Sequence, residues 1–192
     1  GTVWAWGNVL LPNGAGAYNV PTQISTLSSI KEIKANALNL ISLRQDGTVW
    51  TSGGNSKGQL GNGTISDAAA PVRVPGLAAV QTIAAGVEFG LVLTADGKIH
   101  AWGSNAAGQL GNGDILENRD PGQITSLGTV LDYSVTPNHS FAVKENGTVW
   151  AWGYNYGGHL GDGSTINRSA PVQVSGLSGV SKVSASVSFA AA

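Results

Sequence analysis

The residues best suited to acid–base or metal chemistry are the three histidines, His100, His139 and His159. A metal site needs several ligands that converge on one point, and the spacing His-Glu-x-x-His, which puts two ligands on one helix face, is absent. Each histidine also falls at a place where other copies of a repeat, described below, carry a different residue type. We therefore predict that the histidines are structural, that the chain holds no metal or cofactor, and that it is not an enzyme.

Acidic loops and glycine-rich segments are the remaining candidates for ligand chemistry. Asp114, Glu117 and Asp120 cluster, and Asp162 lies near Thr165, but neither run has the spacing of a calcium loop with its terminal Glu. The glycine-rich segments lack the Lys-Ser/Thr ending of a phosphate-binding loop, and we expect no helix after them. The sequence therefore predicts solvated loops and turns at these places.

Composition excludes several classes of protein. The 192 residues carry 10 Lys and Arg against 11 Asp and Glu, and the cations are scattered, so we expect no nucleic-acid partner, which would require a basic patch. No apolar stretch is long enough to span a bilayer, and a chain without Cys has no disulfide. The 28 glycines are about twice the usual share, but they lack the three-residue period of collagen.

The glycines belong to an internal repeat. The opening segment Gly-Thr-Val-Trp-Ala-Trp-Gly returns in related forms at Gly47, Gly97 and Gly147. Two further anchors keep a constant spacing, namely the second-block glycines Gly61, Gly111 and Gly161 and the prolines Pro21, Pro71, Pro121 and Pro171. The chain is thus one domain, 1–192, made of four repeats, 1–46, 47–96, 97–146 and 147–192.

Each repeat is predicted to be a small antiparallel sheet. Short apolar runs such as Val80–Ala85 and Phe89–Thr94 are bounded by Gly-containing turns, and Asp96-Gly97 is typical of a tight hairpin turn. No segment keeps a helical period over ten residues. All six tryptophans follow that turn, at two strand positions where we expect them to pack between neighbouring sheets: Trp4, Trp6, Trp50, Trp102, Trp150 and Trp152.

The motif GTVWAWG-x-N-x-x-GQLGNG, followed by P-V-x-V-x-GL and V-x-x-IAAG, resembles the repeat of the regulator of chromosome condensation family, in its bacterial form. The resemblance covers essentially the whole chain. It implies an all-β β-propeller whose blades each have four antiparallel strands, usually seven blades in all. Four repeats provide material for only part of such a ring.

The first and last repeats break at the same point of the motif, which leaves three arrangements open. One chain could close as a four-bladed ring, two chains could form an eight-bladed ring, or the chain could be an arc or fragment of a larger propeller. We favour an arc, or a ring completed by another chain, because four blades is the lower end of the usual range. Open sheet edges recruit strands, so a homo-oligomer formed through the terminal strands is expected. The absence of an initiating Met further suggests a segment of a longer protein.

Loops that differ between repeats are where we expect a partner to bind, because a rigid scaffold carries its recognition residues on loops. The candidates are Tyr154, Asn155, Tyr156, Glu117, Arg119, Asn167 and Arg168. The leading hypothesis is a noncatalytic scaffold that binds another protein or itself. The alternatives are a subunit that assembles head to tail into a ring or fibre, an inhibitor of a secreted enzyme and, least favoured, a GTPase exchange factor or a propeller hydrolase. The composition, poor in Lys and free of Cys, favours a bacterial protein that is secreted or lies at the cell surface.

Overall fold

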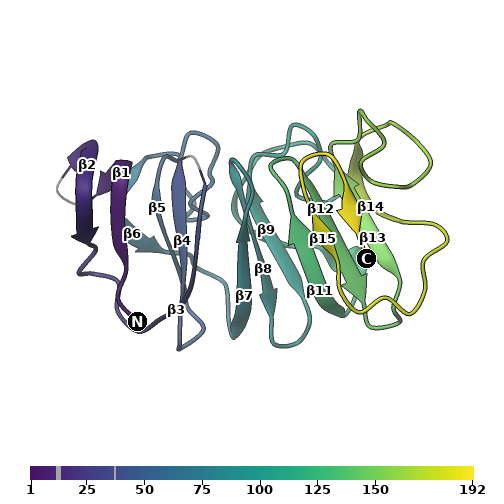
Figure 1. Ribbon diagram of the computed structural model, residues 1–192, viewed down its shortest axis with the longest axis horizontal. Helices are drawn as coiled ribbons and strands as arrows, with labels where there is room; N and C mark the ends of the chain where they lie inside the picture. Colours follow the sequence, from purple (N-terminus) through teal and green to yellow (C-terminus); the bar gives the residue numbers. More distant parts are fainter. Residues whose placement is uncertain (12–13, 37) are drawn as a thin grey trace.

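The computed structural model describes residues 1–11, 14–36 and 38–192, and these form an all-β protein. Three sheets of four antiparallel strands and two two-stranded hairpins stand side by side in one row (Figure 1). The only helix in the described part of the chain is a short 3-10 turn, η1 (Thr125–Leu127). The predicted fold class, an all-β protein with four-stranded antiparallel blades, is confirmed.

Each four-stranded sheet, called a blade here, uses strands in chain order. Blade I consists of β3 (Ile30–Ala35), β4 (Asn39–Arg44), β5 (Val49–Gly53) and β6 (Ala68–Arg73). Blade II consists of β7 (Val80–Ala85), β8 (Phe89–Thr94), β9 (Ile99–Gly103) and β10 (Asn118–Gln123). Blade III consists of β11 (Val130–Val135), β12 (His139–Lys144), β13 (Val149–Gly153) and β14 (Arg168–Gln173). The hairpins are β1 (Trp4–Leu11) with β2 (Gly14–Gln23), and β15 (Ser184–Ala185) with β16 (Ala190–Ala191).

The blades are offset from the sequence repeats by half a unit. In blade II, β7 and β8 come from repeat 47–96, whereas β9 and β10 come from repeat 97–146. The Asx-Gly turn at each repeat boundary therefore lies inside a blade, where it joins the second strand to the third. In the first repeat, β1 runs directly into β2 as a hairpin, and residues 12 and 13 of its shortened segment lie outside the described residues.

The repeated Asx-Gly-Thr-Val-Trp segment is explained by hydrogen bonds of its own side chains. Asp46 Oδ1 accepts from the backbone N and the Oγ1 of Thr48 at 3.0 and 2.7 Å, and Gly47 adopts a φ of 79°. Thr48 Oγ1 in turn accepts from Trp50 Nε1 at 3.2 Å. Because glycine adopts a positive φ without a Cβ clash, this order of residue types closes the hairpin and orients the tryptophan in one step.

The first strand of each blade lies at the inner edge of the arc. Strands β3, β7, β11 and β15 contact their neighbours from blade to blade. Lys31 Nζ donates to Gln81 O at 2.8 Å, and Val183 N donates to Asp132 Oδ2 at 2.8 Å. The outermost strands carry the repeated prolines, which suit a sheet edge because they have no N–H to donate: Pro21, Pro71, Pro121 and Pro171.

The hydrophobic core lies between blades. Trp102 and Trp152 are fully buried, and each packs against the face of the preceding blade, Trp102 on Ile41 and Trp152 on Leu91. The partly buried Trp50 packs on the β1–β2 hairpin cluster. Burying two whole indole rings makes these layers the main source of stability, since an aromatic side chain removes a large apolar area from water.

Trp4 and Trp6 do not occupy the predicted position between sheets. Their exposed fractions are 50% and 63%. Val3 and Ala5, which alternate with the two tryptophans, pack on blade I, so the tryptophans point away from the rest of the described chain. The expectation is wrong for these two residues because no blade precedes β1 within the described chain.

The β1–β2 hairpin lies at the purple end of the row, and the β15–β16 hairpin, drawn in yellow, overlaps blade III in this view and contacts it through β11 (Figure 1). The described residues therefore form an open arc. Of the three arrangements considered from the sequence, closure of a single chain into a four-bladed ring is not the one observed.

Candidate functional site

The loops that join the third strand of a blade to its fourth are the longest in each blade. They span residues 54–67, 104–117 and 154–167, and the last of them projects at the upper right of Figure 1. Their equivalent places in neighbouring blades put them along the same side of the arc. We call this surface the loop face.

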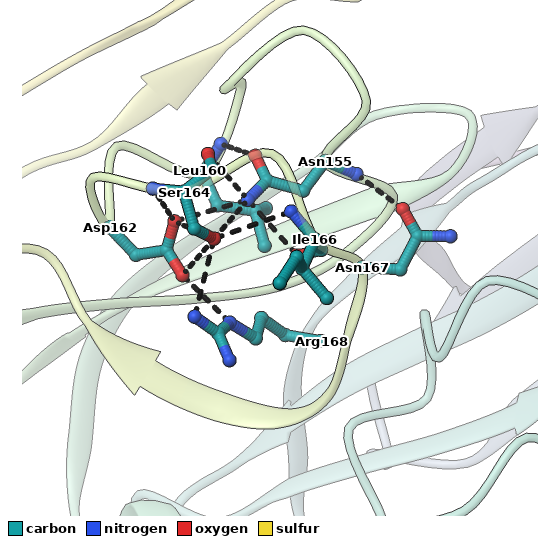
Figure 2. Close-up of polar contacts among 7 residues, drawn as sticks. All are labelled: Asn155, Leu160, Asp162, Ser164, Ile166, Asn167 and Arg168. Carbon is teal, nitrogen blue, oxygen red and sulfur yellow. Dashed lines mark hydrogen bonds and ion pairs between the residues drawn. The ribbon is translucent and has the colours of Figure 1, made fainter.

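A buried asparagine organises each of these loops. In the third loop, the side chain of Asn155 is completely buried, and its Oδ1 accepts from Leu160 N at 2.9 Å (Figure 2). Its Nδ2 faces the backbone oxygens of Ser164 and Ile166, each at 3.1 Å, and Asp162 Oδ1 at 3.1 Å. Asn55 and Asn105 are equally buried and accept from the corresponding leucine N–H groups in their own loops. One amide side chain thus replaces the backbone pairing that a strand would provide.

The third loop adds an ion pair that the other two lack. Arg168 Nε donates to Asp162 Oδ2 at 2.7 Å, and Asp162 is almost fully buried (Figure 2). Burial by itself raises the pKa of the Asp162 carboxyl, but hydrogen bonds from Arg168, Ser164 and Asn155 outweigh it and lower that pKa to about 2. The carboxylate is therefore charged at neutral pH and serves to hold the loop.

The first and second loops are also fixed to the next blade. Gly63 N donates to Arg119 O at 3.1 Å, and Gly113 N donates to Ser169 O at 2.9 Å. Lys57 Nζ and Glu117 Oε1 form an ion pair of 2.7 Å between the first and second loops. The loop face is consequently a set of loops held in register by the blades beneath them.

Asn155 was predicted to contact a partner, and the structure contradicts that prediction. An exposed Asn155 would leave the Leu160 N–H without its acceptor, so the side chain turns inward. The exposed Asn167 uses its Oδ1 to accept from Asn155 N at 2.8 Å, and the guanidinium of Arg168 is engaged with Asp162. These three residues, which come from two variable segments of the sequence, lie together and build the loop.

The other predicted binding residues are distributed along the loop face. Tyr156 is 78% exposed, whereas Tyr154 is only partly exposed and stacks on His159 with ring centroids 6.0 Å apart. Glu117 is exposed but paired with Lys57. Arg119 is exposed, and its Cα and Cγ lie so close to Gly58 that a Cβ added there would be 2.9 Å from each. Tyr156 is thus the member of the set most available to a partner.

The exposed aliphatic residues of the loop face were not predicted as binding residues from the sequence. Leu116 is 70% exposed and Ile166 is 65% exposed, and two more isoleucines in the first and second loops are also exposed: Ile65 and Ile115. The sequence does indicate this exposure, because these aliphatic residues lie in short polar segments that lack the alternating pattern of a strand and so have no core position to fill.

The histidines do not converge on a common point. His139 is buried and stacks on His159 at 5.6 Å, while the half-buried His100 lies in blade II at a tryptophan position. Burial, followed by the charge of His159, lowers the pKa of His139 to about 4. Among the described residues, no three His, Cys, Asp or Glu side chains are arranged to hold a metal ion.

Residues 54–58 match the nucleophile spacing Gly-x-Ser-x-Gly, which the sequence analysis overlooked, but they lead into a loop where a nucleophile elbow would lead into a helix. No helix within the described ranges is long and apolar enough to cross a membrane.

Comparison with protein-family models identifies the repeat. A model of the Regulator of chromosome condensation (RCC1) repeat matches residues 46–93, 96–143 and 146–192, and a second model with the same description matches residues 80–109. The chain belongs to the RCC1 repeat family. The resemblance inferred from the tryptophan and glycine motifs is thereby confirmed. No curated protein sequence matches the chain.

Solved RCC1-type propellers share the fold. Prp20p from Saccharomyces cerevisiae, described with its binding properties to Gsp1p and histones, is 22% identical, with a TM-score of 0.77 over 91% of this chain and 46% of Prp20p. Yeast RCC1 (Prp20) bound to Kap60 is 20% identical, with a TM-score of 0.83 over 99% of this chain and 49% of that one. Human WBSCR16 is 22% identical, with a TM-score of 0.81 over 97% of this chain and 52% of the WBSCR16 chain. At these identities the likeness shows the fold alone, and the chain spans about half the length of each relative.

Proposed function

We propose that this chain is a noncatalytic propeller scaffold that binds another protein through its loop face. The observation that carries the proposal is the exposure of large apolar side chains, Leu116, Tyr156 and Ile166, on loops that are held by their own buried asparagines. Exposed apolar groups on a rigid support mark interaction sites, because they gain free energy only when a partner covers them. Tyrosine and aliphatic side chains surrounded by polar loop residues also match the usual make-up of an interface.

The inner strands are a weaker candidate for the same role. A hollow of about 350 Å³ lies along them, lined by Glu32, Lys34, Asp132 and Tyr133 among others. Glu32 already pairs with Lys34 at 3.2 Å, and Asp132 pairs with Lys182 at 3.5 Å, so the charges on this surface are largely satisfied within the chain. The loop face, whose apolar side chains stay exposed, is therefore the stronger candidate for the surface that binds a partner.

Affinity capture with matched variants tests the proposal. The immobilised chain is exposed to an extract of the source organism, and the bound proteins are quantified by mass spectrometry. A loop-face variant, Leu116→Ser with Tyr156→Ser and Ile166→Ser, is compared with a control that changes exposed apolar residues of the inner strands, Ile33→Ser with Leu131→Ser. We expect a protein that is captured by the native chain and the control but lost with the loop-face variant. Captured proteins that are unaffected by the loop-face changes, or that depend on Ile33 and Leu131, would contradict the proposal.

We further propose that the chain acts outside a bacterial cell, at the surface or in the medium. The support is compositional: no Cys is present, and charged residues make up only 11% of the chain. Fractionation of the source organism followed by immunodetection tests this location. Recovery confined to the cytosolic fraction would overturn it.

A further inference from the structure

The charges of the chain are divided unevenly over its surface. The loop face, together with the strand ends and turns that adjoin it, carries six carboxylates: Asp67, Glu88, Asp114, Glu117, Asp120 and Asp162. The same surface carries three cationic side chains: Lys57, Arg119 and Arg168. On the rest of the chain the cationic side chains outnumber the carboxylates. The near-neutral total is therefore the sum of an acidic loop face and a weakly basic remainder.

Glu88 and Asp120 lie outside the long loops but at the same end of the blades. Glu88 O accepts from Ser104 N, at the start of the second loop, at 2.8 Å. Asp120 lies beside the first loop, because a Cβ added to Gly63 would be 3.4 Å from its Oδ1. The ion pairs among the described residues include neither carboxylate. Both carboxylates therefore keep their charge available to a partner.

Two of the three cationic side chains are used within the loop face. Lys57 pairs with Glu117 and Arg168 pairs with Asp162, each at 2.7 Å. The other four carboxylates face one further cationic side chain, Arg119. Because the Debye length is about 8 Å at physiological ionic strength, this excess acts on a partner at close range, where it selects the charge of the surface in contact.

The acidic charge adjoins the apolar side chains of the second loop. Ile115 and Leu116 are 62% and 70% exposed, and in the chain they lie between Asp114 and Glu117. Asp114 Oδ1 accepts from Leu116 N at 2.8 Å, so this carboxylate holds the turn that exposes the leucine. Apolar and anionic groups thus form one continuous surface on this loop.

The exposed tyrosine of the third loop favours the same kind of partner. An aromatic ring attracts a Lys or Arg side chain placed over its face. The chain already uses this contact elsewhere, since Arg44 lies 4.1 Å from the centroid of Trp50 and Lys144 lies 4.9 Å from that of Trp150. Tyr156, which is 78% exposed, offers a ring of this kind to a partner.

We infer that the loop face binds a protein whose contact surface is cationic, with Lys and Arg side chains around an apolar centre. The inference rests on the proposed function, since it specifies the chemistry of the protein that covers Leu116, Tyr156 and Ile166. An acidic partner would bring like charges together on binding, and an uncharged one would remove water from carboxylates without supplying a counter-charge. A cationic partner satisfies both kinds of exposed group at once.

Three synthetic peptides of equal length and pattern test the charge requirement. One contains Leu and Lys, the second Leu and Glu, and the third Ser and Lys. Each carries a fluorescent label, and its binding to the 192-residue chain is measured by anisotropy. We expect the Leu/Lys peptide to bind with a Kd at least about 10-fold lower than either of the others, and to weaken as NaCl is raised.

Removing the unpaired carboxylates tests where the peptide binds. The variant Glu88→Gln with Asp120→Asn keeps the size of both side chains and removes two negative charges from the loop face. Because each contact between exposed charges is worth up to about 1 kcal/mol, the Leu/Lys peptide should bind about 5-fold more weakly to this variant.

A matched control removes two negative charges from the opposite end of the blades. Asp46→Asn with Glu145→Gln has the same net charge as the loop-face variant. Both new residues suit their turns, since Gln45 and Asn146 are the native residues at these positions in other blades. Binding of the Leu/Lys peptide to this control should stay within about 2-fold of the native value, because screening weakens charges that lie far from the contact.

The outcomes separate this inference from the proposed function. Absence of binding by the Leu/Lys peptide, equal binding by the Leu/Glu peptide, or equal weakening in both charge variants would overturn the cationic partner. A captured protein that depends on Leu116, Tyr156 and Ile166 but binds through an acidic surface would also overturn it, while leaving the loop face as the binding site.

Discussion

The buried asparagine of the third loop is predicted to contribute more to stability than any exposed residue of that loop. In the Asn155→Ala variant, the Leu160 N–H stays buried without an acceptor, and the carbonyls of Ser164 and Ile166 lose their shared donor. A buried polar group left unsatisfied costs about 1–3 kcal/mol, and the carbonyls near the surface can bind water. We therefore expect the free energy of unfolding to fall by about 3 kcal/mol.

Urea unfolding followed by tryptophan fluorescence measures this loss. Asn167→Ala is the matched control, because it removes one hydrogen bond to the same loop from an exposed side chain and should cost about 1 kcal/mol or less. Asn155→Asp keeps the shape of the side chain but places a second carboxylate 3.1 Å from Asp162, so it should be at least as destabilising as alanine at pH 7. Equal stabilities for the alanine variants at 155 and 167 would refute the central role given to the amide.

Three further outcomes are expected. The pKa of His139 falls from 6.5 to about 4 on folding, so the unfolded state takes up this proton at a higher pH than the folded state does. The contribution of His139 to the free energy of unfolding should be full above pH 6.5 and decline towards pH 4 by up to about 3 kcal/mol. His139→Phe should remove this decline when unfolding is measured across that pH range. Asp162→Asn should keep the turn but lose the ion pair with Arg168, lowering the free energy of unfolding by about 2 kcal/mol, whereas an unchanged stability would mean that the carboxylate does not hold the loop. Gly111→Ala should lower the melting temperature more than Gly113→Ala, by the equivalent of about 2 kcal/mol, because a Cβ at Gly111 alone would meet the Trp152 indole. Equal shifts would contradict the packing of that indole on Gly111.

The blades could be predicted from the sequence because their anchors are local. Asx-Gly turns, the tryptophan strand and the outer proline each depend on the chemistry of a few consecutive residues, and the fixed spacing repeats them. The half-unit offset between repeat and blade could not be predicted from composition, because it depends on which strand pairs with which across the Asx-Gly turn.

The site was less predictable because it depends on how a loop folds back on itself. Nothing adjacent to Asn155 indicates that its amide is buried, since its partners lie five to eleven residues further along the chain. The exposure of Trp6 depends on the absence of a neighbouring blade, although its sequence is that of a core tryptophan. The exposure of Leu116 and Ile166 could have been predicted from the sequence, because both are aliphatic residues in polar loops. The charged residues of the same loops were chosen as candidates in their place.

Hydrogen exchange with a captured partner tests the binding surface most directly. Amide exchange rates are compared for the chain alone and for the chain with the protein that the affinity capture identifies. We expect slower exchange in residues 104–117 and 154–167, with little change in β3, β7 and β11. Protection confined to those inner strands would contradict the loop face as the site where this scaffold binds its partner.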